Sequence, residues 1–160
     1  MDHPVLFPTH LAAAYVLGKR WDLSAPLLVV GAALPDLIDK PAALVGIVDL
    51  YQTAAHSLPV LVAGFVVVFL RRAWTPVWLG WASHLALDAV HMIVNGRPTD
   101  LLFLGWPAIR HTPVISLPPI AFARYYVATP SFFVECVVWG ALAAAILRRR
   151  SSESRTERRG

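Results

Sequence analysis

Apolar residues fill five runs of the chain, and short stretches rich in proline, glycine and charged residues separate them. A helix that crosses a bilayer needs about 20 apolar residues, and most of the runs approach or reach that length. The first run is short, and Pro8 fits the first turn of a helix there, where a missing N–H is not needed. We expect this first helix to be tilted, re-entrant or only partly inserted. The runs cover residues 5–18, 25–50, 58–70, 75–94 and 131–147.

Composition places these helices in a membrane. Hydrophobic residues make up 57% of the 160 positions and charged residues only 15%, with a mean hydropathy of +0.58. An ordinary soluble domain carries about 25% charged residues. The sequence therefore predicts an all-α fold, a polytopic integral membrane helical bundle of about four to five membrane segments. We expect these segments to form a single domain over residues 1–147.

Residues 95–130 differ from the rest because proline interrupts every apolar stretch in them. Proline lacks a backbone donor and breaks helix interiors, so no long helix is expected here. Trp106, Tyr125 and Tyr126 suit the headgroup level of a bilayer. We interpret the segment as a cap of short helices at the outer membrane interface.

Charge is concentrated at the C-terminus. Residues 1–147 hold eight Lys/Arg and eight Asp/Glu, so the formal net charge of +4 arises from residues 148–160. We predict a disordered cytoplasmic tail that contacts anionic lipids, because basic juxtamembrane segments mark the inner face. The basic pairs Lys19-Arg20 and Arg71-Arg72 give the same orientation. We therefore expect a multi-pass protein of the cell (inner or plasma) membrane with no nucleic-acid partner.

Ionisable residues inside the apolar runs are the strongest indication of function, because charged groups in hydrocarbon are costly. A rise of about 1.5 Å per residue places six of them in one slab, roughly 12 to 23 Å from the inner boundary. Four separate segments contribute to this slab. The six residues are His10, Asp36, Asp39, His56, His84 and Asp88.

The spacing of these residues favours a metal site. His84 and Asp88 are four apart and His91 follows three later, so all three share a helix face. Asp36 and Asp39 share a face in the same way. Imidazole and carboxylate are ligands for zinc, manganese or iron, and a metal would keep buried carboxylates ionised. The sequence predicts a divalent transition metal here, with zinc as the expected ion, present as one or more ions.

Most of these residues also have a purely structural interpretation. A helix histidine such as His10 is commonly a hydrogen-bonded packing residue. Asp36 follows a proline and fits a buried cap at a kink. Asp39 fits an ion pair with Lys40 or a contact with outer headgroups, and His56 lies near a helix start, where polar residues are ordinary.

Four short motifs in this order resemble the YdjM-like family of predicted membrane-bound metal-dependent hydrolases. They are Thr9-His10, the LPD of residues 34–36, His56-Ser57, and Gly80 with the following SHLALD. The resemblance covers residues 8–107, and the family is distantly similar to zinc-dependent phospholipase C and related single-strand nucleases. It implies a metal-ligand set composed of His10, Asp36, His56, His84 and Asp88.

The chain departs from the family at one place. Members commonly have a His-Arg pair shortly before the second His, whereas Tyr51 and Gln52 stand at about that place here. One ligand or phosphate contact of the family is therefore missing. His91, or His111 in the cap, is a candidate to replace it.

Together these features predict a metal-dependent hydrolase that acts on a phosphoester or related bond of a lipid or lipid-linked substrate. Asp39 and His91 are the candidates for a catalytic base or for a supporting contact to the ligands. Two alternatives stay open. One is an ion- or proton-coupled transporter, because intramembrane Asp and His also line ion pathways. The other is a non-catalytic membrane protein that its metal stabilises.

Overall fold

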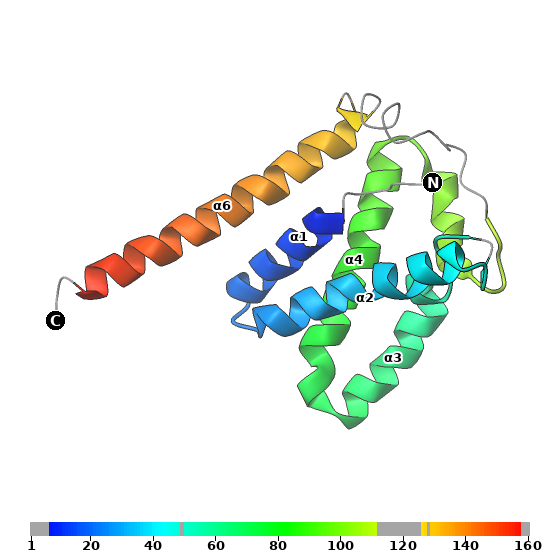
Figure 1. Cartoon of the computed structure of the whole chain (residues 1–160), viewed down its shortest axis with the longest axis horizontal. Helices are drawn as coiled ribbons and strands as arrows, with labels where there is room; N and C mark the ends of the chain where they lie inside the picture. Colours follow the sequence, from blue (N-terminus) through cyan, green and yellow to red (C-terminus); the bar gives the residue numbers. More distant parts are fainter. Residues whose placement is uncertain (1–6, 49, 112–125, 128, 158–160) are drawn as a thin grey trace.

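The chain is all-α, as predicted, in a computed structural model that describes residues 7–48, 50–111, 126–127 and 129–157. Figure 1 shows that the first and last long helices run alongside each other. Short 3-10 helices are η1 (Ala54–His56), η2 (Arg72–Trp74) and η3 (Pro98–Gly105). The long helices are α1 (Phe7–Arg20), α2 (Ala25–Leu44), α3 (Leu58–Leu70), α4 (Thr75–Val94) and α6 (Pro130–Glu157).

Proline marks the start of every long helix. It occupies the first or second position in each, where its fixed φ suits the first turn and no N–H is needed. Ser57 adds an N-cap to α3, because its hydroxyl accepts a hydrogen bond from the backbone N–H of Val60 at 3.4 Å. The start that was predicted at Pro8 is confirmed. The prolines are Pro8, Pro26, Pro59, Pro76 and Pro130.

Two helix ends differ from the apolar runs. The run 25–50 forms a helix only to Leu44, because Gly46 follows the C-cap with a φ of 74° and ends the helix in the left-handed region. At the other end of the chain, α6 continues to Glu157, into the segment 148–160 that we expected to be disordered. Arg and Glu are good helix formers, so the helix does not stop where the apolar run stops.

The described part of the expected cap contains the short helix η3. Its Phe103 is buried, and its ring centroid lies 6.3 Å from that of His56. Residues 112–125 and 128 of the cap, including Tyr125, lie outside the described residues. Within the described part of the cap, η3 thus reaches His56.

A close crossing of α2 and α4 determines how the core is built (Figure 1). A Cβ atom on Gly31 would overlap the carbonyl of Val77, and one on Gly80 would overlap the carbonyl of Leu28. Any larger residue would push the two helices apart. Ala14, Leu28 and Ala32 form a buried hydrophobic cluster beside this crossing.

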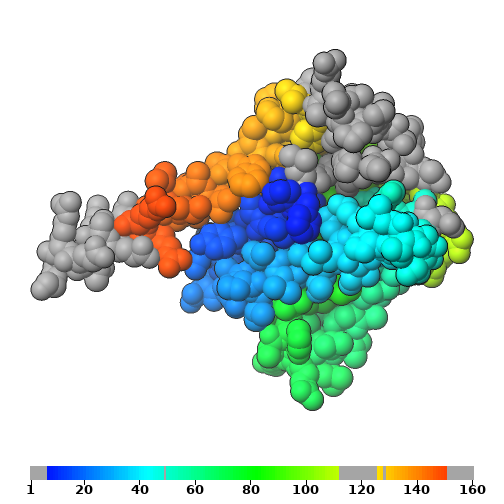
Figure 2. All heavy atoms as spheres, in the orientation of Figure 1, coloured from blue at the N-terminus to red at the C-terminus, as the bar shows by residue number. Residues whose placement is uncertain are grey.

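The last helix, α6, packs mainly on α1. The indole Nε1 of Trp139 donates a hydrogen bond to the hydroxyl of Thr9 at 3.2 Å. Figure 2 shows α6 (yellow to orange) meeting α1 (dark blue) and then projecting beyond the body of the molecule.

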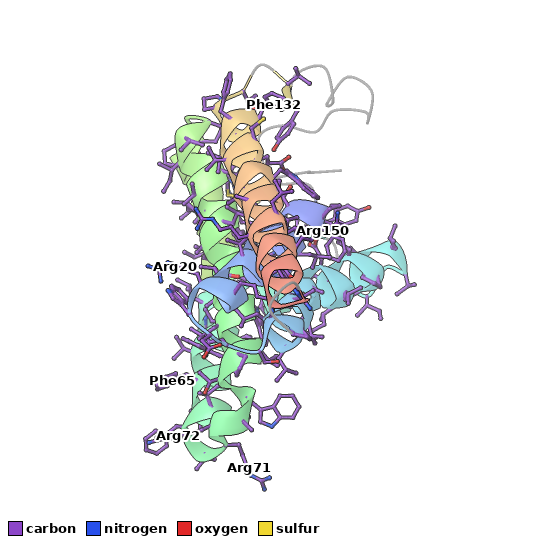
Figure 3. The ribbon with its side chains drawn as sticks, turned by 90° about the vertical axis from the view of Figure 1, so that its left-hand side faces the viewer. Arg20, Phe65, Arg71, Arg72, Phe132 and Arg150 are labelled. Carbon is purple, nitrogen blue, oxygen red and sulfur yellow. The ribbon has the colours of Figure 1, made fainter. Side chains whose placement is uncertain are left out.

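Much of the outer surface is apolar. Phe65 and Phe69 of α3 are 51% and 76% exposed, and Figure 3 shows Phe65 on the outside of the molecule. In the described part of the chain, two segments are long and apolar enough to cross a membrane, by length and composition. They are Arg72–Val94 and Pro130–Arg150, while the apolar helix Leu58–Leu70 is shorter.

Candidate metal centre

Five histidine and aspartate side chains meet between the helices, and we call them the His/Asp cluster. All five are buried, with at most 7% of each side chain exposed. Two overlapping sets, His10–His84–Asp88 and Asp36–His56–His84, each offer ligand atoms within 4.8 Å of one another. The cluster could therefore hold a metal ion. Its members are His10 from α1, Asp36 from α2, His56 from η1, and His84 and Asp88 from α4.

Asp39 fixes the ring of His56. Its Oδ2 lies 2.8 Å from His56 Nδ1, and a carboxylate only accepts, so Nδ1 carries the proton. The carboxylate also accepts the backbone N–H groups of Thr53, Ala55 and His56 at 2.8, 3.1 and 3.1 Å. The Nε2 lone pair of His56 then points into the cluster, as in carboxylate–histidine–metal sites. With these four bonds accepted, Asp39 fits the supporting role better than the role of base.

A backbone carbonyl fixes the ring of His84. Its Nδ1 lies 2.7 Å from the carbonyl oxygen of Ala32, which is one helical turn before Asp36 on α2. Because a carbonyl only accepts, Nδ1 carries the proton and the Nε2 lone pair points into the cluster. This contact depends on the close crossing of α2 and α4 at Gly31 and Gly80.

The distances between donor atoms fit one metal ion. His56 Nε2 lies 3.3 Å from His84 Nε2 and 3.4 Å from Asp36 Oδ1, and His84 Nε2 lies 3.5 Å from Asp88 Oδ2. Tetrahedral ligands at about 2.0–2.1 Å from zinc are separated by about 3.3 Å. Two further pairs, His84–Asp36 and His56–Asp88, are both 3.9 Å apart. Asp36, His56 and His84 therefore have separations close to those of three ligands on one ion.

His10 extends the cluster on its other side. Its ring stacks on that of His84 with centroids 3.8 Å apart, and its Nε2 lies 3.2 Å from Asp88 Oδ1. Asp88 thus directs Oδ2 toward His84 and Oδ1 toward His10. Asp88 Oδ1 and His10 Nδ1 are buried without an aligned hydrogen-bond partner among the described residues. A buried polar atom without a partner lowers the stability of the fold unless a ligand pairs with it. These two atoms therefore fit a site for more than one ion.

The charge balance also favours a cation at this place. Burial alone lowers the pKa of His56, but hydrogen bonds to Asp36 and Asp39 and the charge of Asp88 outweigh burial and raise this pKa to about 9. Positive charge beside His56 Nε2 is therefore favoured, and a metal ion bound there would take the place of a proton.

Two contacts in the cluster were not foreseen in the sequence. Gln52 Nε2 donates to Asp88 Oδ2 at 3.5 Å, so the residue that stands where the family has its His-Arg pair touches an expected ligand. Lys40 lies 2.7 Å from Asp36, not beside Asp39 as one interpretation had it. Residues four apart share a helix face and adjacent residues do not, which explains this choice. Asp39 is only 1% exposed and faces no headgroups.

Neither His91 nor His111 belongs to the two metal-capable sets found among the described residues. His91 is buried, and its Nδ1 lies 2.7 Å from the carbonyl oxygen of Leu87. His111 Nε2 lies 2.8 Å from Asp100, which Arg97 also contacts at 3.1 Å. Gln52, by contrast, contacts the His/Asp cluster through Asp88.

Comparison of the chain with known proteins gave no match among family models, curated proteins or solved structures. Fold alone does not imply function, so function is argued here from the chemistry of the site.

Proposed function

We propose that the chain is a membrane-embedded, metal-dependent hydrolase that acts on a phosphoester or related bond of a lipid or lipid-linked substrate. The observation that carries this proposal is the convergence of imidazole and carboxylate ligand atoms in two overlapping buried sets that share His84. A divalent metal supplies two effects for hydrolysis, since it lowers the pKa of a bound water and polarises a phosphoryl oxygen. The motifs shared with the YdjM-like family support the hydrolase class.

In this proposal the five residues of the His/Asp cluster hold the metal, and Asp39 positions His56. Imidazole nitrogen and carboxylate oxygen ligands suit zinc. Gln52 keeps Asp88 in place through its amide. Asp39 does not take the proton from water in this proposal, because its carboxylate already accepts four hydrogen bonds.

The membrane location rests on the apolar surface. Large exposed side chains cover α3 and α6, and contiguous apolar surface of this kind is rare on a soluble monomer. We propose that α1, α2 and α3 join the two longer segments in the membrane. The basic residues at the ends of α1, α3 and α6 would then lie on the cytoplasmic side.

The experiment uses the full chain purified in detergent. Its metal content is measured, and its hydrolysis of phosphatidic acid and phosphatidylglycerol is followed before chelation, after chelation and after zinc is restored. Turnover that is lost and regained with the metal supports the proposal. Ion flux in liposomes without turnover would instead favour a transporter. Bound metal with neither activity would favour a structural role.

A further inference from the structure

Two cavities adjoin between α1 and α6, away from the His/Asp cluster. The larger has a volume of about 730 Å³ and lies where both helices leave their apolar stretches. The smaller, of about 310 Å³, lies between α1, α4 and α6. Val16 and Ala141 line both cavities, so the two form one feature, which we call the α1/α6 groove.

The mouth of the groove is strongly basic. Lys19 and Arg20 of α1 face Arg148 and Arg149 of α6 across it, and no carboxylate is among the described residues that line it. Lys19 Nζ also lies 5.7 Å above the ring of Tyr15. Figure 3 views the molecule from the side on which α1 and α6 end. Four cations around one opening are suited to a phosphate group.

The inner part of the groove is apolar. Its walls are alanine, valine and leucine side chains from three helices, with Ser83 as the polar exception. The space stays open because α6 lines the groove with small residues such as Ala141, Ala144 and Ala145. The groove is therefore charged at one end and hydrocarbon-like along the other.

We infer that the α1/α6 groove binds an anionic phospholipid, with the phosphate between the four cations and an acyl chain along the apolar part. This inference rests on the proposed membrane location and not on hydrolysis. Basic pockets between membrane helices on the cytoplasmic side bind anionic headgroups, and the groove has that composition and that place. A free phosphate ion would use only the mouth and leave the apolar part without a role.

The groove is separate from the metal centre. At about 100° per helical residue, Ser83, Leu87 and Val90 form one stripe of α4, whereas His84 and Asp88 lie on the neighbouring stripe. None of the residues that line the groove belongs to the His/Asp cluster. The lipid in the groove is thus a bound partner of the fold and not the substrate.

The test titrates the full chain in detergent with phosphatidylglycerol that carries a spin label on its acyl chain. The immobilised fraction of the label reports binding. Phosphatidylcholine with the same acyl chains is the zwitterionic lipid for comparison, and inorganic phosphate is the competitor. We expect phosphatidylglycerol to bind roughly tenfold more tightly than phosphatidylcholine, with little competition from phosphate.

Two pairs of variants test the two ends of the groove. Lys19→Gln combined with Arg148→Gln should weaken phosphatidylglycerol binding by roughly 30-fold, because each cation near an anionic lipid contributes about a factor of five. Its control, Arg71→Gln with Arg72→Gln, removes the same charge from the tip between α3 and α4 and should bind normally. Ala141→Phe should fill the apolar part and release the acyl chain.

The control for Ala141→Phe is Ala143→Phe, because Ala143 lines neither cavity. Equal binding of both lipids, equal loss in a control variant, or full competition by phosphate would overturn the inference. A dimer that lipid does not dissociate would assign the groove to a second copy and overturn it as well. If the double charge variant does not fold, Ala141→Phe decides alone, since it changes no charge.

Metal content separates this inference from the proposed function. The groove variants should keep their metal, because they contact no member of the His/Asp cluster. Normal metal with no selective lipid binding would refute the lipid site alone. Selective lipid binding in a chain without metal would refute the hydrolase alone, and release of the chain from membranes by alkaline carbonate would refute the membrane location on which the lipid site rests.

Discussion

The Nε2 atoms of His56 and His84 lie 3.3 Å apart and face each other in the interior of the protein. Both rings are fixed from the opposite nitrogen, His56 by the carboxylate of Asp39 and His84 by the carbonyl of Ala32. Two lone pairs that point at each other repel unless a proton or a metal ion lies between them. The fold therefore holds these two rings in an arrangement that requires positive charge.

Metal content is the first prediction. Elemental analysis of the purified chain should find a transition metal, with zinc expected, at about one ion per chain or more. Replacing both His84 and Asp88 with Ala should remove most of it, because His84 belongs to both metal-capable sets and Asp88 to one of them. A matched control replaces Asp100, which is buried, and its half-buried partner His111, both outside the cluster, and should retain the metal. Unchanged metal in the first variant would show that the site is misplaced.

Asp88→Asn tests whether that residue is a ligand or a packing residue. Asn keeps nearly the same shape and can still hydrogen-bond, but it lacks the charge that a cation needs. Asp88 is fully buried, so removing an expensive anion can leave folding intact or improve it. We expect a folded chain with little metal, measured by circular dichroism together with elemental analysis. A folded variant with full metal content and activity would refute the assignment of Asp88 as a ligand.

Asp39→Asn tests the positioning of His56. The variant should bind metal about 10- to 100-fold more weakly, because a supporting carboxylate sets the orientation and basicity of a histidine ligand. Competition with a chelator of known affinity measures this change. Asp100→Asn is the control, since Asp100 is equally buried and also contacts a histidine. Equal metal affinity in the wild type and Asp39→Asn would mean that Asp39 does not position a ligand.

Gly80→Ala tests the crossing of α2 and α4. The added methyl group would overlap the backbone of Leu28, so we expect a loss of about 1–3 kcal/mol in the free energy of unfolding. Thermal unfolding in detergent, followed by circular dichroism, measures the difference. Gly64→Ala is the control, because its new methyl group would lie at an ordinary 3.4 Å from Trp78. Equal stabilities of the two variants would contradict the close crossing.

Orientation in the membrane is the last prediction. A reporter fused after Gly160 should be cytoplasmic, and a cysteine introduced at Thr99 in η3 should react with an impermeant label from outside. The basic residues that follow α1, α3 and α6 are the reason, since Lys and Arg accumulate on the cytoplasmic side. The opposite labelling pattern would place the metal centre nearer the cytoplasmic leaflet.

Local spacing made much of this protein predictable. Helix starts at proline, the helical fold, and the shared face of His84 and Asp88 all follow from residues that are near one another in the chain. Within one helix there are 3.6 residues per turn, so the sequence spacing of two residues determines whether they share a face. The C-terminal end of α2 was less predictable, because the hydrophobic pattern continues past the left-handed turn at Gly46.

Contacts between helices were decided by tertiary structure alone. The sequence could place Asp36 and Asp39 on one face, but it could not say that His56 of η1 pairs with Asp39 of α2. Nor could it show that the carbonyl of Ala32 orients His84. Such contacts depend on the angle and distance at which helices cross, and those depend on packing summed over many residues, which no local pattern encodes.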